Sequence, residues 1–187
     1  DGSDWAWYQF ASGPVTVDLA AGSASGVDGS DTLSFIENVF GSIFDDTLTG
    51  DIADNILEGH VGADAIDGGD GFDTASYASA DAPVTINLQT NQHTGEAAGD
   101  TYVSIERVLG SAYDDVVHAA SSGIHLAGGL GDDTFYAAEG HDSLDGGEGN
   151  DTVSYENSAI RVNVNLHSGA GLDGAAGDSF IDIESVI

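Results

Sequence analysis

Cysteine and methionine are absent from this 187-residue sequence, and basic residues are nearly so. The absence of cysteine excludes a disulfide framework and any zinc site with cysteine ligands. Only Arg107 and Arg161 oppose 33 acidic residues, so the formal net charge is −31. Without a basic patch to displace counterions from phosphates, we expect no nucleic-acid partner. No apolar run approaches the ~20 residues that span a bilayer, and we expect no direct membrane insertion.

The acidic excess has its own consequence. A chain with this charge repels itself and stays disordered unless counterions neutralise it, and divalent cations are the obvious candidates. The six histidines have no zinc spacing, HExxH is absent, and no Ser-His-Asp or phosphate-loop arrangement has structural context. We therefore expect a module that is not an enzyme.

A nine-residue pattern recurs along the chain, with the form G-G-x-G-x-D-x-U-x, where U is a large apolar residue. Its clearest copies are GGDGFDTAS at 68–76, GGLGDDTFY at 128–136 and GGEGNDTVS at 146–154. Four contiguous nonapeptides fill residues 41–76, and five fill residues 110–154.

A longer segment of 33 residues occurs three times, at 8–40, 77–109 and 155–187. The copies align without gaps, so that VTVDL in the first matches VTINL in the second and VNVNL in the third. The first two copies are offset by 69 residues and the next two by 78, a difference of nine. This difference indicates that the nonapeptide is a structural unit. We expect residues 1–187 to form a single repeat domain, cut from a longer protein.

The nine-residue period suggests a geometry. Six residues rich in glycine and aspartate favour a turn, and the last three favour a short strand whose middle side chain points inward. The nine residues at this eighth position are all apolar, as a buried stripe requires: Leu48, Leu57, Ile66, Ala75, Val117, Leu126, Phe135, Leu144 and Val153. Two nonapeptides complete one coil, so that repeats n and n+2 stack about 4.8 Å apart.

The long segments have the pattern of a strand, a polar glycine-rich loop and a second strand, and we expect them to be enlarged coils of the same solenoid. The sequence therefore predicts an all-β fold. Its class is a parallel β-roll, a two-sheet β-solenoid, with three longer strand-loop-strand inserts.

Aspartate at the sixth position of the nonapeptide indicates calcium. Ca²⁺ takes six to eight oxygen ligands from carboxylates and backbone carbonyls, and a glycine-rich turn exposes carbonyls. The pairs expected from stacking are Asp46 with Asp64, Asn55 with Asp73, Asp115 with Asp133, Asp133 with Asp151, and Ile124 with Asp142. Asn55 brings no charge, so we expect its site to be weaker. The repeat at 119–127 has neither the leading glycines nor the aspartate, so we expect the calcium ladder to break there.

The nonapeptides resemble the calcium-binding β-roll of the RTX (repeats-in-toxin, hemolysin-type) proteins, over about half of the chain. The resemblance implies that the first repeat of a stacked pair supplies the carbonyls of positions two and four, and the second those of positions one and three. For one pair, Gly129 and Gly131 with Asp133 would then face Gly146 and Glu148 with Asp151. The other carbonyl ligands implied in this way are Gly59, Val61, Gly68, Asp70, Gly128 and Leu130.

The same resemblance implies roughly 4–8 calcium ions and a secreted or cell-surface bacterial protein that leaves the cell through a type I secretion channel. The favoured function is a structural module that folds on binding calcium outside the cell. The alternatives are a carbohydrate-binding module, the C-terminal roll of a secreted polysaccharide-active enzyme or metallopeptidase, and a repeat unit of an adhesin. Polysaccharide and neighbouring domains of a parent protein are the partners that these alternatives imply.

Further acidic residues recur in the three long copies. Glu37, Glu106 and Glu184 are either caps for the terminal calcium of a stack, together with Asp45 or Asp114, or surface glutamates at strand ends. Aspartates at another shared position are either turn formers or calcium ligands: Asp31, Asp100 and Asp178.

Three aromatic residues near the start form a WAWY motif where the other copies read TASY and TVSY. Trp5 and Trp7 flank Ala6 and are expected to point outward. With Tyr8 they form either a platform for sugar rings or a surface that packs on a neighbouring coil or domain.

Overall fold

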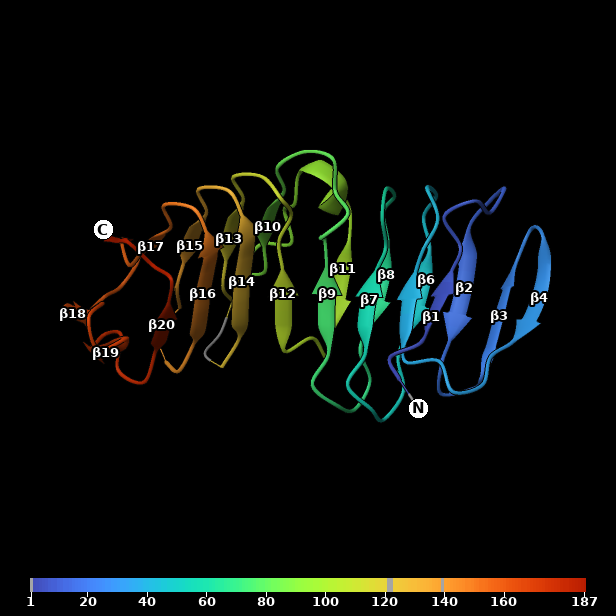
Figure 1. Ribbon diagram of the computed structural model, residues 1–187, viewed down its shortest axis with the longest axis horizontal. Helices are drawn as coiled ribbons and strands as arrows, with labels where there is room; N and C mark the ends of the chain where they lie inside the picture. Colours follow the sequence, from blue (N-terminus) through green and yellow to red (C-terminus); the bar gives the residue numbers. More distant parts are fainter. Residues whose placement is uncertain (1, 121–122, 139) are drawn as a thin grey trace. The chain divides into compact units, whose positions relative to one another are not determined.

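The computed structural model describes residues 2–120, 123–138 and 140–187. Short strands dominate this part of the chain, and its single helical turn is the 3-10 segment η1 (Gly95–Ala97) (Figure 1). The chain forms two compact units: residues 1–77 with 96–107 (unit 1), and residues 78–95 with 108–187 (unit 2). In neither unit does a described helix have the length and apolarity needed to cross a membrane.

Unit 1 contains two sets of stacked strands. One set has the order β1-β5-β7-β9, and its strands pair in parallel. In the other set, β11-β8-β6-β2 is parallel and continues through antiparallel β3 and β4. The bounds are β1 (Trp5–Trp7), β2 (Val15–Asp18), β3 (Ser23–Gly26), β4 (Gly29–Thr32), β5 (Asn38–Phe40), β6 (Thr47–Thr49), β7 (Ile56–Glu58), β8 (Ala65–Asp67), β9 (Thr74–Ser76) and β11 (Thr101–Val103).

Unit 2 follows the same plan. One set, β10-β13-β15-β17-β21, is parallel throughout, and the other runs β12-β14-β16-β20 before antiparallel β19 and β18. The bounds are β10 (Thr85–Asn87), β12 (Arg107–Leu109), β13 (Val116–His118), β14 (His125–Leu130), β15 (Thr134–Tyr136), β16 (Ser143–Glu148), β17 (Thr152–Ser154), β18 (Val162–Asn165), β19 (Ala170–Asp173), β20 (Ser179–Ile181) and β21 (Ser185–Val186).

Nonapeptide n stacks on nonapeptide n+2 in both units. In unit 1, Leu48 of β6 lies opposite Ile66 of β8. In unit 2, Phe135 of β15 lies opposite Val117 of β13 on one side and Val153 of β17 on the other. The parallel, two-sheet arrangement confirms the predicted β-roll class.

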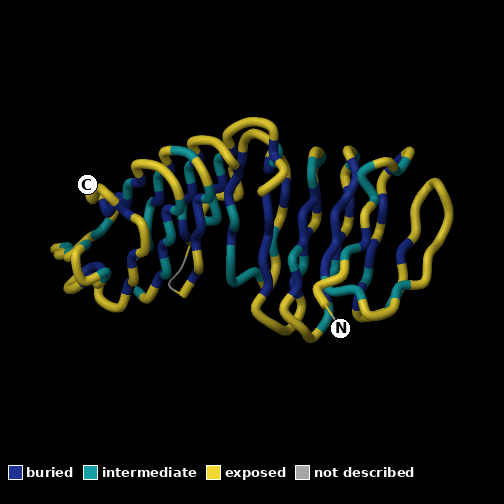
Figure 2. The backbone as a smooth tube through the Cα atoms, viewed as in Figure 1, coloured by how far each residue is buried: buried dark blue, intermediate teal, exposed yellow. Residues whose placement is uncertain are grey.

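The eighth-position residues form the core. All nine have an exposed fraction of 2% or less. In unit 1, Leu48 and Ile66 of one sheet pack in the same cluster as Val39 and Leu57 of the other. Figure 2 shows buried residues along the strands and exposed residues at the turns of each unit. The middle residue of each nonapeptide strand therefore defines the interior, and in β9 the flanking Thr74 and Ser76 are buried as well.

The long segments contain more strands than the strand-loop-strand pattern predicts. The first copy holds β2 to β5, the second holds β10, β11 and β12, and the third holds β18 to β21. The additional strand after the polar loop continues a nonapeptide stack: β11 pairs with β8, and β20 pairs with β16. Such a short strand has little signal of its own, because its partner is a coil distant in sequence.

Candidate metal centres

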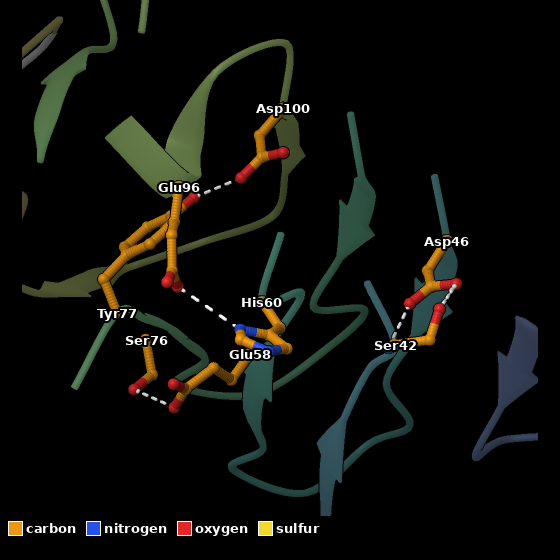
Figure 3. A network of polar contacts seen from close by, with 8 residues as sticks. All are labelled: Ser42, Asp46, Glu58, His60, Ser76, Tyr77, Glu96 and Asp100. Atoms are coloured by element: carbon orange, nitrogen blue, oxygen red, sulfur yellow. Dashed lines mark hydrogen bonds and ion pairs between the residues drawn. The ribbon is translucent and has the colours of Figure 1, made fainter. Parts of the chain in front are cut away.

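The sixth-position side chains point inward at the turns and are buried. Each has an exposed fraction of 2% or less, apart from Ile124 at 8%: Asp46, Asn55, Asp64, Asp73, Asp115, Asp133, Asp142 and Asp151. They lie just before the strands, so the stacking of strands brings the side chains of repeats n and n+2 together. Figure 3 shows Asp46 in this position, before β6.

One oxygen of each stacked carboxylate accepts a hydrogen bond from the backbone amide of the sixth-position residue in the neighbouring coil. The Asp46 amide donates to Asp64 Oδ1 at 2.8 Å, and the Asp115 amide donates to Asp133 Oδ1 at 2.7 Å. The Asn55 amide donates to Asp73 Oδ1 at 2.8 Å in the same way. The pairs expected from the sequence therefore lie side by side.

The second oxygen of most of these carboxylates, Oδ2, accepts no hydrogen bond. Within the described residues, five sixth-position Oδ2 atoms are buried and have no hydrogen-bond partner: those of Asp64, Asp73, Asp133, Asp142 and Asp151. Burying a carboxylate oxygen without a partner is costly unless a cation compensates it. This donor set fits a hard divalent cation such as Ca²⁺.

The pKa values of these carboxyl groups reflect the same environment. Burial raises the pKa of Asp64 to about 8, and neighbouring Asp100 adds to the effect. Burial also raises the pKa of Asp133 to about 7 and that of Asp73 to about 6. For Asp142 and Asp151 the pKa is likewise raised, mainly by burial. No basic side chain contributes to these shifts, so the charge is left for a cation to balance.

First-position glycines leave room for oxygen atoms at the same place. A methyl group on Gly146 would overlap both Asp151 Oδ2 and the Asp182 carbonyl oxygen. A methyl group on Gly128 would overlap Asp133 Oδ2 and lie 2.7 Å from the Gly146 carbonyl oxygen. A carboxylate and a backbone carbonyl thus converge beside each glycine, as a calcium site requires.

Five of the remaining implied carbonyl donors lie in the glycine-rich turns: Gly59, Val61, Gly68, Asp70 and Gly131. The other three lie in strands, Gly129 and Leu130 at the end of β14 and Glu148 at the end of β16. The Glu148 carbonyl also accepts a hydrogen bond from the Gly131 amide at 2.9 Å. Where side chains are described, no three His, Asp or Glu residues gather into a metal cluster. The assignment of backbone carbonyls as calcium ligands stays a prediction.

The repeat at 119–127 keeps the backbone ladder although it lacks the aspartate. The amides of Gly123 and Ile124 both donate to Asp142 Oδ1, at 2.9 and 3.3 Å. Residues 121–122 of this turn lie outside the described residues. The missing carboxylate therefore leaves the hydrogen-bonded stacking intact, and the predicted break concerns calcium alone.

The other acidic candidates, two aspartates and three glutamates, also accept backbone amides from a stacked coil. Asp45 Oδ1 accepts the Ala63 amide at 2.9 Å, and Asp114 Oδ1 accepts the Asp132 amide at 2.9 Å. The glutamates of the long segments take the place of a sixth-position aspartate. Each accepts an amide from a stacked coil: Glu37 from Asp4, Glu106 from Asp73 and Glu184 from Asp151. Their role as calcium caps stays a prediction.

Two kinds of residue in these ladders were not identified from the sequence. Ser42 and Ser111 hold the first aspartate of each block, and Tyr77 and Tyr155 hold a buried aspartate in the long segments. The signal was present, since a tyrosine and an aspartate 23 residues apart recur in all three long copies. The repeat alignment alone does not show that the two side chains meet.

A comparison with protein families agrees with this geometry. The model of the RTX calcium-binding nonapeptide repeat matches residues 40–75 and 125–153, in four copies. These segments are RTX calcium-binding repeats. Between these segments the match leaves out residues 76–124, which include the nonapeptide at 110–118 and the start of the repeat without the aspartate. No curated protein sequence matches the chain significantly.

The RTX repeats identify calcium as the cation that the buried carboxylates accommodate. They form a structural calcium-binding module, in which the metal holds adjacent turns together. The residues of this chain that ligate each ion, and the number of ions, follow below as proposals.

Proposed function

We propose that this RTX module folds when it binds calcium outside the cell. The observation that carries the proposal is the set of five buried, unpartnered carboxylate oxygens. Without a cation, these groups and the formal charge of −31 oppose the compact state. With calcium bound at each stacked pair, the same groups stabilise it.

The expected size of the effect is large compared with the stability of a domain. A site at tenfold calcium excess over its dissociation constant contributes about RT ln 11, or about 1.4 kcal/mol. Asp142 is left out because its stacked partner is Ile124, so one ion for each of the other unpartnered oxygens gives four sites. Together they contribute roughly 6 kcal/mol. Domains are stable by about 5–15 kcal/mol in total. Calcium therefore decides whether this chain is folded.

This dependence fits a secreted or cell-surface protein. Extracellular calcium sites have dissociation constants of about 10⁻⁴–10⁻³ M, far above cytosolic calcium. The chain would stay unfolded inside a bacterial cell and pass through a type I secretion channel, as the RTX resemblance implies. It would fold on reaching millimolar calcium.

The test is far-UV circular dichroism of the whole chain in calcium, in EDTA and in magnesium at the same ionic strength. We expect a coil spectrum in EDTA and a β spectrum in calcium, reversed by chelator. Magnesium should be a poor substitute, because it demands regular octahedral geometry and loses water reluctantly. The same β spectrum in calcium and in EDTA would contradict the proposal.

A pocket of about 280 Å³ in unit 1 supports a second candidate, a carbohydrate-binding module. Its lining includes Trp7 at the end of β1, Tyr8 and Phe10 just after it, and Asp28 and Asp31 from the β3–β4 hairpin. Trp7 and Phe10 are 57% and 90% exposed. Exposed aromatic faces stack on sugar rings, and carboxylates accept hydrogen bonds from sugar hydroxyls.

The pocket's acidic rim belongs to the first long copy. Asp28 is exposed, whereas the equivalent residues of the other copies, Ala97 and Ala175, are fully buried. Trp5 lies beside the pocket, with its ring centroid 5.6 Å from that of Trp7. Of the three residues of the predicted platform, Trp7 and Tyr8 line the pocket and Trp5 does not.

Affinity electrophoresis in gels containing neutral polysaccharides tests this second candidate, in calcium throughout. We expect Trp7→Ala to remove any retardation of the wild type, and Trp5→Ala to retain most of it. A wild-type chain that is not retarded by any polysaccharide would exclude the candidate. Whether a longer protein containing this module is a polysaccharide-active enzyme, a metallopeptidase or an adhesin is decided by the gene sequence on both sides.

A further inference from the structure

The rows of stacked carboxylates have ends at which the second oxygen is satisfied by the protein itself. Within a row, Oδ2 is buried without a partner, as at Asp64 and Asp142. At the ends of the rows, hydroxyl and amide groups donate to the carboxylate instead. This difference separates carboxylates that need a cation from those that do not.

The first aspartate of each nonapeptide block is held by a serine. Ser42 donates its amide to Asp46 Oδ2 at 2.5 Å and its hydroxyl to Asp46 Oδ1 at 2.8 Å. Ser111 does the same for Asp115, at 2.5 and 2.8 Å. The Ser42 and Asp46 contacts are visible in Figure 3.

In two rows, those that end at Asp100 and Asp178, the last aspartate is held by a tyrosine from the long segment. The other two rows continue to Glu106 and Glu184 instead. Asp100 Oδ1 accepts the Asp64 amide at 2.8 Å, as a sixth-position aspartate would. Its Oδ2 accepts the Tyr77 hydroxyl at 2.5 Å (Figure 3). Asp100 and Tyr77 are both 1% exposed, so this contact is inaccessible to solvent.

Unit 2 repeats the arrangement independently. Asp178 Oδ1 accepts the Asp142 amide at 2.8 Å, and its Oδ2 accepts the Tyr155 hydroxyl at 2.5 Å. Asp178 is 3% exposed. In the first long copy the equivalent pair, Tyr8 and Asp31, is longer at 3.2 Å and Asp31 is exposed. Two buried pairs and one exposed pair therefore occur in the same chain.

A tyrosine hydroxyl does for Asp100 what a cation is required to do for Asp64. It provides a short, charge-assisted hydrogen bond to a carboxylate oxygen that water does not reach. A hydroxyl satisfies one acceptor, whereas a calcium ion gathers six to eight oxygens from two turns. The hydroxyl therefore stabilises the coil without adding a metal site.

We propose that Tyr77 and Tyr155 end the calcium rows by replacing the cation at Asp100 and Asp178. The two long segments then close against the nonapeptide stacks without calcium of their own. Calcium binding is confined to the unpartnered carboxylates within the rows. This inference rests on the proposed calcium binding and adds which buried aspartates take no part in it.

The test is the number of calcium ions bound per chain, measured by equilibrium dialysis of the intact protein. We expect Asp100→Asn to bind as many ions as the wild type, because the amide keeps the oxygen that accepts the Asp64 amide. The matched variant Asp64→Asn should lose at least one ion. An Asp100→Asn variant that also loses an ion would overturn the proposal.

A second pair of variants tests the tyrosine directly. The double variant Tyr77→Phe/Tyr102→Phe removes the donor to Asp100 Oδ2 and the neighbouring hydroxyl that touches it, so we expect this variant to gain one calcium ion per chain. The control Tyr8→Phe, whose partner Asp31 is exposed, should bind the wild-type number. No gain in a folded double variant would overturn the proposal; if that variant does not fold, the Asp100→Asn result decides.

These outcomes are distinct from failure of the proposed function. A wild-type chain that binds no calcium would refute the calcium-dependent module and the row-end inference together. A wild-type chain that binds calcium, combined with ion loss in Asp100→Asn, would refute the row-end inference alone.

Discussion

Asp133→Asn is the substitution for which calcium should reverse the sign of the effect. Asp133 lies in the middle of a row: its Oδ1 accepts the Asp115 amide at 2.7 Å, and its amide donates to Asp151 Oδ1 at 2.8 Å. Asparagine keeps the shape and the oxygen that accepts the Asp115 amide. It removes the charge on the oxygen that has no partner.

With calcium, the substitution weakens two stacked pairs at once. Each site at tenfold calcium excess is worth about 1.4 kcal/mol, so the loss is about 3 kcal/mol. Asp142→Asn, whose stacked partner Ile124 has no carboxylate, should lose less than one full site, at most about 1 kcal/mol. Equal losses for the two variants would contradict the pairing.

Without calcium, the same change should stabilise the fold at pH 8. Burial raises the pKa of Asp133 to about 7, so its ionised form costs stability that grows as the pH rises from the unfolded-state value towards 7. Above pH 7 the carboxyl group is ionised in the folded state too, and the loss of folding stability no longer grows. At 1.36 kcal/mol per unit it is at most about 4 kcal/mol, which we halve to about 2 kcal/mol for solvent screening.

Urea unfolding followed by far-UV circular dichroism at pH 8 measures both effects. Sucrose added to the EDTA samples favours the compact state enough to give a transition. The control is Asp132→Asn, because the exposed Asp132 side chain lies one residue away and accepts only exposed contacts from Asn150. It should change stability by less than about 0.5 kcal/mol in either buffer. A shift of the same sign for Asp133→Asn in calcium and in EDTA would refute the reasoning.

Three further outcomes are expected. In EDTA the folded fraction should fall as the pH rises from about 5 to 8, because the pKa of Asp64 is raised to about 8 and that of Asp133 to about 7; a folded fraction that increases with pH, followed by circular dichroism, would show the opposite linkage. Gly128→Ala should raise the calcium midpoint at least tenfold, because the added methyl overlaps Asp133 Oδ2, and an unchanged midpoint in a calcium titration would contradict that close approach. Phe135→Ala should destabilise the calcium-bound form by about 3–5 kcal/mol, whereas Phe10→Ala at an exposed site should cost less than about 0.5 kcal/mol in the same urea assay.

The nonapeptide part of the fold could be predicted because the residue pattern within each repeat is enough to define its turn and its strand. An apolar eighth position and a turn-forming first half define the strand, the face it buries and the stacking of n on n+2. The burial of residues as different as Ala75 and Phe135 follows from position alone. The sixth-position carboxylates could be paired for the same reason.

The long segments could not be predicted in this way. Strands such as β11 and β20 have three residues each and form because a nonapeptide coil lies alongside. Their pairing is a contact between residues distant in sequence, which no local pattern records. The hairpin of β3 and β4 could not be predicted from the repeat either. The first copy forms this hairpin, whereas the second copy forms η1 in the corresponding region.

By itself, the sequence determined the β-roll, the stacking period and the identity of the metal, because all three depend on residues within one or two repeats. Only the tertiary structure decided which carboxylates are left without a partner. Asp64 and Asp100 are both buried aspartates on one ladder, yet a tyrosine hydroxyl reaches Asp100 and nothing in the described chain reaches Asp64 Oδ2. That distinction depends on Tyr77, 23 residues before Asp100. A side chain's need for calcium is set by the donors that the fold brings to it.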